Sequence, residues 1–540
     1  MNLTTLLAER AADHPDRPAL IESRGARDVS ISYVELARRV AAGAAFLEHI
    51  GLRRGSVILV FQPVSIELYE LLLSAFHSGL KVMLADPSAG RKFLSICCRR
   101  LMPQAFFGSW KAQCLRLTVP EMRRIPISIC PGAWFPGARA WRTDSEGVAI
   151  MEVADDEPAL VTFTSGSTGV PKAAVRTHGF LLAQHRTLSN ALDFEDGEVD
   201  LITLPVFVLA NLASGLTSVL AATNLAKPGS PDVKAIMKQC DTFRVTRCAA
   251  SPAFFEGLLA GGMPSFDKVY TGGAPVFPDL LRRLRNALPE ARIHSVYGST
   301  EAEPIVHFAA EDADDGTDSL TRNGGGLCSG VPVAEIDLKI IADRWGTPLG
   351  PMDELAFAAL SVSNGQAGEI IVSGDHVLRG YLDGVGDEDT KIHVAGMVWH
   401  RTGDAGWLDP QGRVWLLGRC AEKLPPFPAV DGLPLDASRY PFAIECALRE
   451  MFPGVRMATL EWEGRRTLVV GRLCDASEAA EIGTAAEKFG IDRIIYLESL
   501  PLDRRHQAKI DYPALRELLG TTSVRQQALT QQNECSQQQE

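Results

Sequence analysis

Along the first third of the chain, short apolar runs alternate with longer amphipathic stretches, which is the pattern of parallel α/β proteins. Short apolar runs at 56–63 (SVILVFQP), 81–86 (KVMLAD), 105–109 (AFFGS) and 160–166 (LVTFTSG) predict buried strands. Between them, amphipathic stretches such as 33–50 (YVELARRVAAGAAFLEHI) have the spacing of crossover helices. This rhythm predicts a large domain in which α/β layers stack.

The pattern changes twice toward the C-terminus. From 370 to 417, short strands separated by turn signals predict an antiparallel or barrel-like subdomain. A further mixed segment, 419–520, has helical stretches at 443–452 and 486–490, which predicts a small α+β domain with a boundary near 418–424. The predicted units are 1–418, a large N-terminal domain; 419–520, a small C-terminal domain; and 521–540, a disordered tail.

Two segments have compositions that are typical of poorly structured chain. The run 311–326 is acidic and glycine-rich, and we expect it to be a mobile loop. The chain after Gly520 is Gln-rich and has almost no apolar periodicity, which predicts a frayed tail.

Composition restricts the class of protein. The chain has 540 residues, of which 46% are hydrophobic and 22% charged, and this balance argues against wholesale disorder and against a multispan membrane protein. Its net charge of −12 gives no global attraction to nucleic acid, so a polyanion partner would need a local basic patch. The 11 cysteines form no CxxC repeat, and residues 1–16 lack the long apolar run of a signal peptide, so we expect a cytoplasmic protein with reduced thiols.

One stretch, 201–226, carries no charged residue and is long enough to span a bilayer. Pro205, Asn211, Ser214 and Gly215 interrupt it, and no basic cluster flanks it. We therefore predict a buried strand and helix there rather than a membrane span.

The segment 164–172 (TSGSTGVPK) lies between a predicted strand and a helical pattern, and it has the composition of a phosphate-binding loop. Its hydroxyls and backbone N–H groups can donate to phosphate oxygens, its glycines allow close approach, and Lys172 adds a positive charge. The spacing differs from GxxxxGK[ST], which disfavours a P-loop ATPase or kinase, and a simple Ser/Gly linker is the alternative. The candidate nucleotide contacts are Thr164, Ser165, Gly166, Ser167, Thr168 and Gly169.

Later motifs supply the other groups that a nucleotide site needs. Glu301 follows a Gly-Ser-Thr turn, where a carboxylate suits Mg²⁺, although a solvated loop glutamate is the alternative. Gly273, Ala274 and Pro275 let backbone approach a flat ring, and Tyr297 offers an aromatic face, as an adenine pocket requires. Taken alone, the Gly-Gly-Ala-Pro segment would be only a turn.

Two charged residues nearer the C-terminus have a chemical and a structural interpretation. Asp404 could accept hydrogen bonds from a ribose diol or could be a turn aspartate. Lys509 lies in a basic cluster that could equally be a solvated face.

Six motifs in order resemble the adenylate-forming superfamily of acyl-CoA synthetases, peptide-synthetase adenylation domains and luciferases. They are TFTSGSTGVPKAAVRTH, YTGGAPV, VYGSTEAEP, GEIIVSGDHVLRGYL, HRTGDAGWLDPQGRVWLLGR and the late Lys509. The resemblance implies ATP and Mg²⁺ as cofactors, with the metal at Glu301 and Thr164.

The resemblance also assigns roles to single residues. It implies that Thr300 contacts phosphate, that Gly298 and Ser299 join Tyr297 in holding the nucleotide, and that Asp404 binds the ribose with help from Arg419. It makes Lys509 the lysine that a mobile small domain brings in, where an ammonium can neutralise charge in the transition state. Lys172, Thr300, Glu301 and Lys509 are thus the catalytic candidates.

Departures from the superfamily pattern concern the second half-reaction. Ala421 stands where many thioester-forming members have an Asp or Lys pivot, the following Ser-Gly element is missing, and Ala508 replaces a glycine. These changes put CoA-dependent thioesterification in doubt. Within the superfamily, the stretches VSIELYELLLSAFHSG, AFFGSWKAQCLRLTVPEMRRIPI, STEAEPI and DRRHQAKIDYPAL resemble the β-lactone synthetases of the long-chain olefin pathway.

The expected reaction is therefore activation of a carboxylic acid as its acyl-adenylate, after which a β-hydroxyl of the same acid closes a β-lactone and expels AMP. An acyl-CoA or acyl-carrier-protein ligase is the alternative, with pathway enzymes or a carrier protein as partners. A catalytically silent binding protein is a more distant alternative, because the candidate functional residues are all present, namely Lys172, Glu301, Asp404 and Lys509. Phe207, Val208, Leu209 and the segment 252–255 could line an acyl tunnel or pack in the core.

Overall fold

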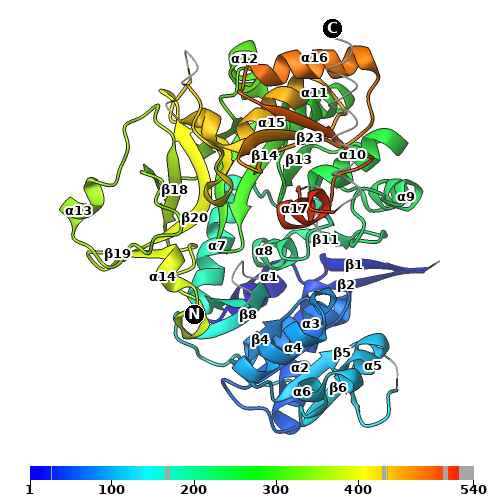
Figure 1. Ribbon diagram of the computed structural model, residues 1–540. Coiled ribbons are helices and arrows are strands. Elements are labelled where there is room, and N and C mark those ends of the chain that lie inside the picture. Colours follow the sequence, from blue (N-terminus) through cyan, green and yellow to red (C-terminus); the bar gives the residue numbers. More distant parts are fainter. Residues whose placement is uncertain are drawn as a thin grey trace.

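The computed structural model describes residues 1–25, 27–132, 134–164, 171–428, 433–434, 436–502 and 509–521. Two large sheets with helices between and around them form most of the molecule, and a small three-stranded unit lies at the C-terminal end (Figure 1). The predicted α/β class is confirmed. Apart from Thr521, the predicted tail lies outside the described residues, as do 165–170 of the phosphate loop.

The first sheet is mostly parallel and lies in the N-terminal third of the chain. Helices α2 (Tyr33–His49) and α3 (Ile66–His77) pack on one face, and α4 (Arg91–Leu101), α5 (Trp110–Thr118) and α6 (Pro120–Arg123) cover the other. Its strands run in the order β7 (Arg139–Ala140), β6 (Ile127–Cys130), β5 (Ala105–Gly108), β3 (Val57–Phe61), β4 (Lys81–Leu84), β8 (Pro158–Thr164) and β9 (Lys172–Thr177). The strands predicted from the apolar runs and the helix predicted at 33–50 are confirmed.

The phosphate loop differs from the expected strand-to-helix connection. Strand β9 pairs antiparallel with β8, and Thr164 lies opposite Lys172 in this register. The segment after the loop pairs with β8 from Lys172 to Thr177, so it forms a strand. Helix α7 (His178–Ala191) begins only after Thr177, which caps it by accepting a hydrogen bond from the Phe180 N–H. The loop therefore joins two strands.

The second sheet changes character at its middle. Strands β1, β11, β10, β12, β13 and β14 pair in parallel, whereas the strands beyond β14 pair antiparallel, as the pattern at 370–417 predicts. Its order is β17 (Asp337–Ile341), β18 (Gly368–Ser373), β20 (Met397–Leu408), β21 (Val414–Arg419), β16 (Leu327–Pro332), β15 (Ala302–Ala309), β14 (Arg292–Ser299), β13 (Lys268–Gly272), β12 (Arg247–Ala250), β10 (Val199–Ile202), β11 (Thr217–Leu220), β1 (Pro18–Arg24) and β2 (Arg27–Ser32), and β19 (Lys391–Val394) pairs with β20.

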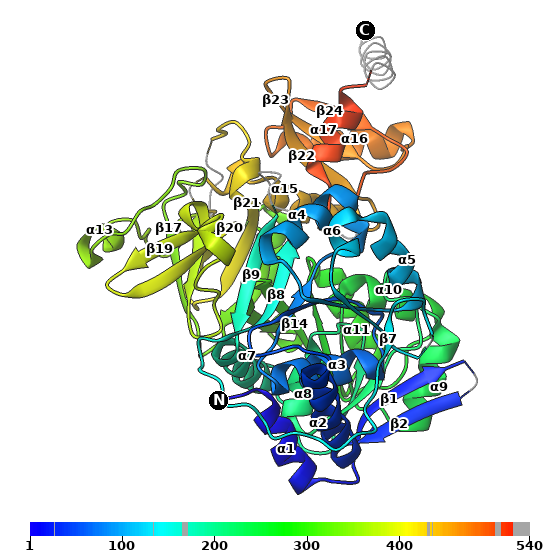
Figure 2. The same cartoon turned by 90° about the horizontal axis from the view of Figure 1, so that it is seen from below.

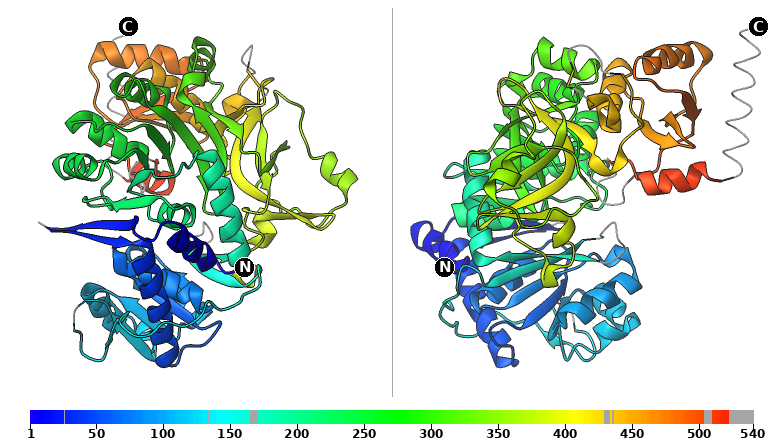
Figure 3. Two further views of the ribbon diagram at one scale, coloured as in Figure 1. Left: turned by 180° about the vertical axis from the view of Figure 1, so that it is seen from behind. Right: turned by 60° about the vertical axis from the view of Figure 1, so that its left-hand side comes forward.

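Helices fill the space between the two large sheets and cover the outer face of the second. The shared core takes in α1 (Thr4–Asp13), α2, α3, α7 and α8 (Phe207–Ser214), and α9 (Val233–Phe243), α10 (Pro252–Gly261) and α11 (Pro278–Ala287) pack on the far face. Short helices α13 (Glu354–Ala358) and α14 (Asp387–Thr390) flank the antiparallel strands. The order of layers is visible in Figure 3.

The expected mobile loop at 311–326 is wrong for most of its length. Helix α12 (Asp315–Arg322) forms there because Asp314 and Thr317 make a capping box, which satisfies backbone donors at the helix start. Thr317 and Thr321 are buried, and α12 packs on the small unit through α15 (Pro441–Met451). A local cap and tertiary packing thus outweigh the acidic, glycine-rich composition.

The uncharged stretch 201–226 contains the end of β10, helix α8 and strand β11, as predicted. Pro205 precedes α8, and Gly215 ends it with a φ of 82°. Among the described residues, we find no helix that combines the length and the apolar character needed to cross a membrane.

The small unit follows β21 and projects from one side of the molecule (Figure 2). It contains the sheet β22 (Met457–Trp462), β23 (Arg465–Val470) and β24 (Arg493–Tyr496), with α15, α16 (Ala476–Glu487) and α17 (Tyr512–Leu519). The helix expected at 443–452 is confirmed as α15. The helix expected at 486–490 begins ten residues earlier than expected and ends at Glu487.

Candidate nucleotide and acid site

A cavity of about 740 Å³ opens at the carboxyl ends of the parallel strands in the second sheet. Leu204, Pro252, Gly273 and Thr300 line it just after β10, β12, β13 and β14, which is where α/β sheets place their ligands. Residues of the small unit, among them Lys509, close its other side. Both parts of the chain therefore contribute to one site.

Most of the residues expected from the sequence meet in this cavity. Its lining includes Gly273, Ala274, Pro275, Tyr297, Gly298, Ser299, Thr300, Glu301, Asp404, Arg419 and Lys509. Lys172 does not line the cavity, and the side chain of Thr164 and residues 165–169 are outside what the structure describes. The phosphate-loop contacts stay predictions.

Asp404 is held between two partners, Arg419 on the neighbouring strand β21 and Tyr297 on β14. Its Oδ2 accepts a hydrogen bond of 2.7 Å from the Tyr297 hydroxyl, and its Oδ1 lies 3.2 Å from Arg419 Nε. Asp404 and Arg419 are opposite each other in the β20–β21 register, so the sheet itself brings the pair together. Burial and the neighbouring carboxylate hold the pKa of Tyr297 well above its usual range. Tyr297 thus orients Asp404 as well as offering an aromatic face.

Glu301 sits in a firmly anchored turn. The Ser299 hydroxyl accepts hydrogen bonds from the N–H groups of Glu301 and Ala302, and the Leu378 N–H donates to the Glu301 carbonyl at 2.7 Å. The Tyr381 hydroxyl donates to Glu301 Oε1 at 2.7 Å. This bond orients the carboxylate and leaves its negative charge available for a cation.

Lys172 belongs to a cationic cluster behind Glu301. Its Nζ lies 5.6 Å from the centroid of the Tyr381 ring, and Lys391 Nζ lies 5.5 Å from the same ring. Burial lowers the pKa of Lys391 to about 8, partly against the attraction of Glu301. One tyrosine therefore contacts two ammonium groups and a carboxylate.

Arg176 fixes the segment that carries Thr300. Its guanidinium donates to the Thr300 carbonyl at 2.7 Å and to the Thr162 hydroxyl at 2.8 Å. Burial lowers the pKa of this arginine. Because Thr162 is in β8 and Thr300 follows β14, the arginine ties the strand before the phosphate loop to the second sheet.

The suggested acyl-tunnel residues divide between cavity and core. Phe207, Pro252 and Ala253 line the cavity, together with Leu204 and Val206. Val208, Phe254 and Phe255 are buried in the hydrophobic cores, and Leu209 packs against one of them. The apolar part of the cavity lies beside α8 and α10.

Three residues of the site were not singled out from the sequence. Arg176 and Tyr381 lie inside two of the six superfamily motifs, but only the fold shows that they reach Thr300 and Glu301. Lys391 lies outside those motifs, and its signal was a lone lysine beside apolar strand residues. Contacts between segments that are distant in the sequence cannot be predicted from the local spacing of residues.

Comparison with known proteins agrees with this geometry. The family model of the AMP-binding enzymes matches residues 7–382. An olefin β-lactone synthetase of Xanthomonas campestris is 30% identical over 94% of this chain and 96% of its own length. A 4-coumarate-CoA ligase of Narcissus pseudonarcissus is 27% identical over 75% of this chain and 73% of its own.

A solved structure has the same fold over nearly the whole chain. The amide bond synthetase McbA of Marinactinospora thermotolerans superposes with a TM-score of 0.74 at 18% identity, covering 95% of this chain and 99% of McbA. The family model spans well over half of the sequence, and the similarity extends to the small unit. The chain belongs to the AMP-binding enzyme family of adenylate-forming enzymes.

Proposed function

We propose that this enzyme joins a carboxylic acid to the α-phosphate of ATP. A carboxylate oxygen forms a bond to the α-phosphorus, the bond to the β-phosphate oxygen breaks, and pyrophosphate leaves with its electron pair. The observation that carries this proposal is the single cavity that holds the Asp404–Tyr297–Arg419 cluster, Glu301 and Lys509. It offers groups for a ribose, a metal and a transition-state charge in one place.

The donor set around Glu301 suits Mg²⁺, which prefers a few carboxylates together with phosphate oxygens. When bound, Mg²⁺ would neutralise phosphate charge, and Glu301 would hold it, with the Thr164 hydroxyl as the second proposed contact. Lys509 supplies a further positive charge beside the α-phosphate, and Lys172 acts at the phosphates. Asp404 and Arg419 orient the ribose, and Gly273, Ala274, Pro275 and Tyr297 receive the adenine.

We propose that the second step is internal. The β-hydroxyl of the bound acyl group attacks the acyl carbon, loses its proton, and expels AMP as the four-membered lactone closes. The 30% identity to an olefin β-lactone synthetase over almost the whole chain supports this step. So does Ala421, which replaces the pivot residue of many thioester-forming relatives.

Transfer to CoA or to a carrier protein is the second candidate. The match to a 4-coumarate-CoA ligase supports it, although that match covers less of both chains. Both candidates share the adenylate, so they differ only in the nucleophile that follows.

The test compares matched pairs of acids, with and without the β-hydroxyl, in the presence of ATP and Mg²⁺. We expect lactone and AMP from the hydroxy acid at a rate that added CoA does not change. The plain acid should remain as bound acyl-adenylate, because it has no internal nucleophile. CoA-dependent thioester from both acids, with no lactone, would favour the ligase.

We further propose that residues 419–520 act as a domain that moves relative to 1–418 during turnover. Lys509 is the reason, since it reaches the cavity from the small unit while most of the other proposed contacts belong to the large one. We place the enzyme in the cytoplasm on the basis of its thiol content.

A further inference from the structure

A strongly basic surface covers the helical face of the first sheet. Between residues 91 and 124 the chain has eight Lys and Arg residues and a single acidic one, Glu121, which gives this segment a charge of +7 in a chain of net −12. The segment contains α4, α5 and α6, which pack on the same face of the sheet through one apolar core. Their outward side chains therefore share one surface, which we call the basic face.

Figure 2 shows α4, α6 and α5 in a row, and α6 contacts both of its neighbours. Arg99 pairs with Glu121 at 2.6 Å, Arg100 lies 3.4 Å from Asp383, and Arg116 is buried. The other five are exposed, and within the described chain none of them forms an ion pair with an acidic side chain. They are Arg91, Lys92, Lys111, Arg123 and Arg124.

Large apolar side chains are exposed among these cations. Trp110 is 54% exposed, Leu117 49%, and Met102 70%. Trp134 is 80% exposed and follows β6, and its neighbour Phe135 packs edge-on against Trp110 at 5.8 Å. Exposed apolar side chains that gather in a patch rimmed by charged residues are typical of sites that bind a protein or a membrane.

The basic face also adjoins the segment that carries the phosphate loop. Arg100, near the C-terminal end of α4, donates to the Pro171 carbonyl at 2.6 Å and to the Leu382 carbonyl at 2.8 Å. Pro171 directly precedes Lys172. A partner on this face would lie next to the segment that carries the phosphate loop.

We propose that the basic face docks the enzyme onto the surface of an anionic phospholipid bilayer. Unpaired arginines and lysines are attracted to anionic headgroups, and indole and aliphatic side chains enter the interfacial layer. Together they supply the two signals that reversible membrane binding requires. An acidic protein would complement the positive charge of the basic face, but it would not explain why Trp134 and Met102 are exposed.

The test measures binding of the full chain to vesicles of phosphatidylcholine alone and of phosphatidylcholine mixed with phosphatidylglycerol. We expect binding only to the anionic vesicles, with an affinity that falls as salt is raised. The variant Lys92→Glu/Arg123→Glu should bind at least about 30-fold more weakly, at about 1 kcal/mol for each basic residue. Trp134→Ser should weaken binding about tenfold without changing the charge.

The matched control is Lys234→Glu/Lys238→Glu, which makes the same change of charge at two exposed lysines of α9. It should bind like the unmodified chain, and all variants should keep their circular dichroism spectrum and their pyrophosphate exchange. Equal binding to both kinds of vesicle, or an equal loss in test and control variants, would overturn the proposal. Binding to an acidic carrier protein or to nucleic acid, with none to vesicles, would also overturn it. Because the readout is vesicle binding, its failure is distinct from a failure of the proposed reaction.

Discussion

Tyr381 links three charged groups of the site through one side chain. Its ring lies beside the ammonium groups of Lys172 and Lys391, and its hydroxyl donates to Glu301. A phenylalanine would preserve the ring contacts and remove only the hydrogen bond. Tyr381→Phe therefore isolates the orientation of the Glu301 carboxylate.

For Tyr381→Phe we expect the apparent KM for magnesium-bound ATP to rise about tenfold, as loss of one hydrogen bond to a charged group predicts. Pyrophosphate exchange measured over a range of Mg²⁺ concentrations gives this value. Tyr33→Phe is the control, because the Tyr33 hydroxyl also donates a buried hydrogen bond, 2.8 Å to the Leu216 carbonyl, and neither residue lines the cavity. An unchanged Mg²⁺ dependence would show that Glu301 needs no help from Tyr381.

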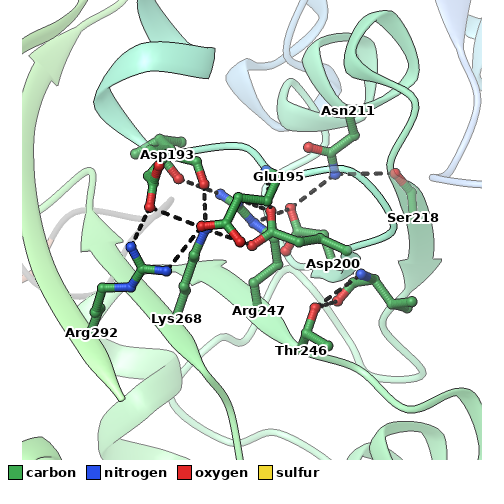
Figure 4. Close-up of polar contacts among 12 residues, drawn as sticks. Asp193, Glu195, Asp200, Asn211, Ser218, Thr246, Arg247, Lys268 and Arg292 are labelled. Carbon is green, nitrogen blue, oxygen red and sulfur yellow. Dashed lines mark hydrogen bonds and ion pairs between the residues drawn. The ribbon is translucent and has the colours of Figure 1, made fainter. Parts of the chain in front are cut away.

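At the scale of elements, an ionic cluster with a buried centre lies at the beginnings of the parallel strands, and Figure 4 shows its polar contacts. The cavity lies at the other, carboxyl ends of these strands. Asp200, Arg247, Lys268 and Arg292 are successive partners in the register of β10, β12, β13 and β14. Arg247 is fully buried and lies 2.6 Å from Glu198 and 3.8 Å from Asp200. Its removal would leave the buried Asp200 carboxyl group without its cation, while Glu198 would keep Lys268, 2.8 Å away.

Arg247→Leu should lower the free energy of unfolding by about 3 kcal/mol or more, because removal of this buried cation leaves the charge of its partner carboxyl group uncompensated. Denaturant unfolding gives the difference. The comparison variant is Arg283→Leu, whose surface pairs with Glu256 and Asp279 should contribute about 1 kcal/mol or less. Equal effects of the two substitutions would mean that the cluster adds no more than a surface pair.

A second prediction about this cluster concerns Asp200 and the dependence of stability on pH. Burial raises its pKa from 3.8 to about 6, and its Oδ1 has no hydrogen-bond partner. Between these two values the folded chain keeps a proton that the unfolded chain has released, so this group lowers stability as the pH rises through that window. Asp200→Asn should flatten that part of the stability profile.

Unfolding midpoints measured from pH 4 to 6 test this expectation, and Asp241→Asn is the control because Asp241 is exposed at the end of α9. A profile that keeps its slope in Asp200→Asn would assign the pH dependence to other groups.

The elements also show how far local patterns reach. Strands β3, β4 and β5 and helix α2 follow from apolar runs and amphipathic spacing, because each buries its own face. Helix α12 could not be read from composition, since its stability depends on the Asp314 cap and on packing against α15. Strand β9 was not predicted, because its sequence KAAVRT does not alternate strictly between polar and apolar residues and runs directly into helix α7. The Tyr297–Asp404 contact joins residues 107 positions apart, which no local motif encodes.

At the scale of the whole molecule, the position of the small unit decides whether the site is complete. Glu450 of α15 lies 3.0 Å from Arg282 of α11, and Arg449 lies 3.9 Å from the Phe277 ring. Asp343 in the large unit accepts a hydrogen bond of 2.8 Å from the Tyr440 hydroxyl. These contacts hold the small unit where Lys509 lines the cavity.

If the large unit binds the nucleotide and the small unit supplies Lys509 for the reaction, a prediction follows for Lys509→Ala. Most of the proposed nucleotide contacts belong to the large unit, so ATP should still bind with an affinity within a few-fold of the unmodified enzyme. Pyrophosphate exchange should fall at least about 100-fold, because the ammonium acts on charge that develops only in the transition state. Equilibrium ATP binding and exchange, measured on the same preparation, separate the two effects.

Lys488→Ala is the matched control, since it removes an exposed lysine of the same unit outside the cavity lining. If Lys509→Ala lost ATP binding and exchange in equal proportion, the lysine would serve ground-state binding, and the small unit would not need to move to bring it in.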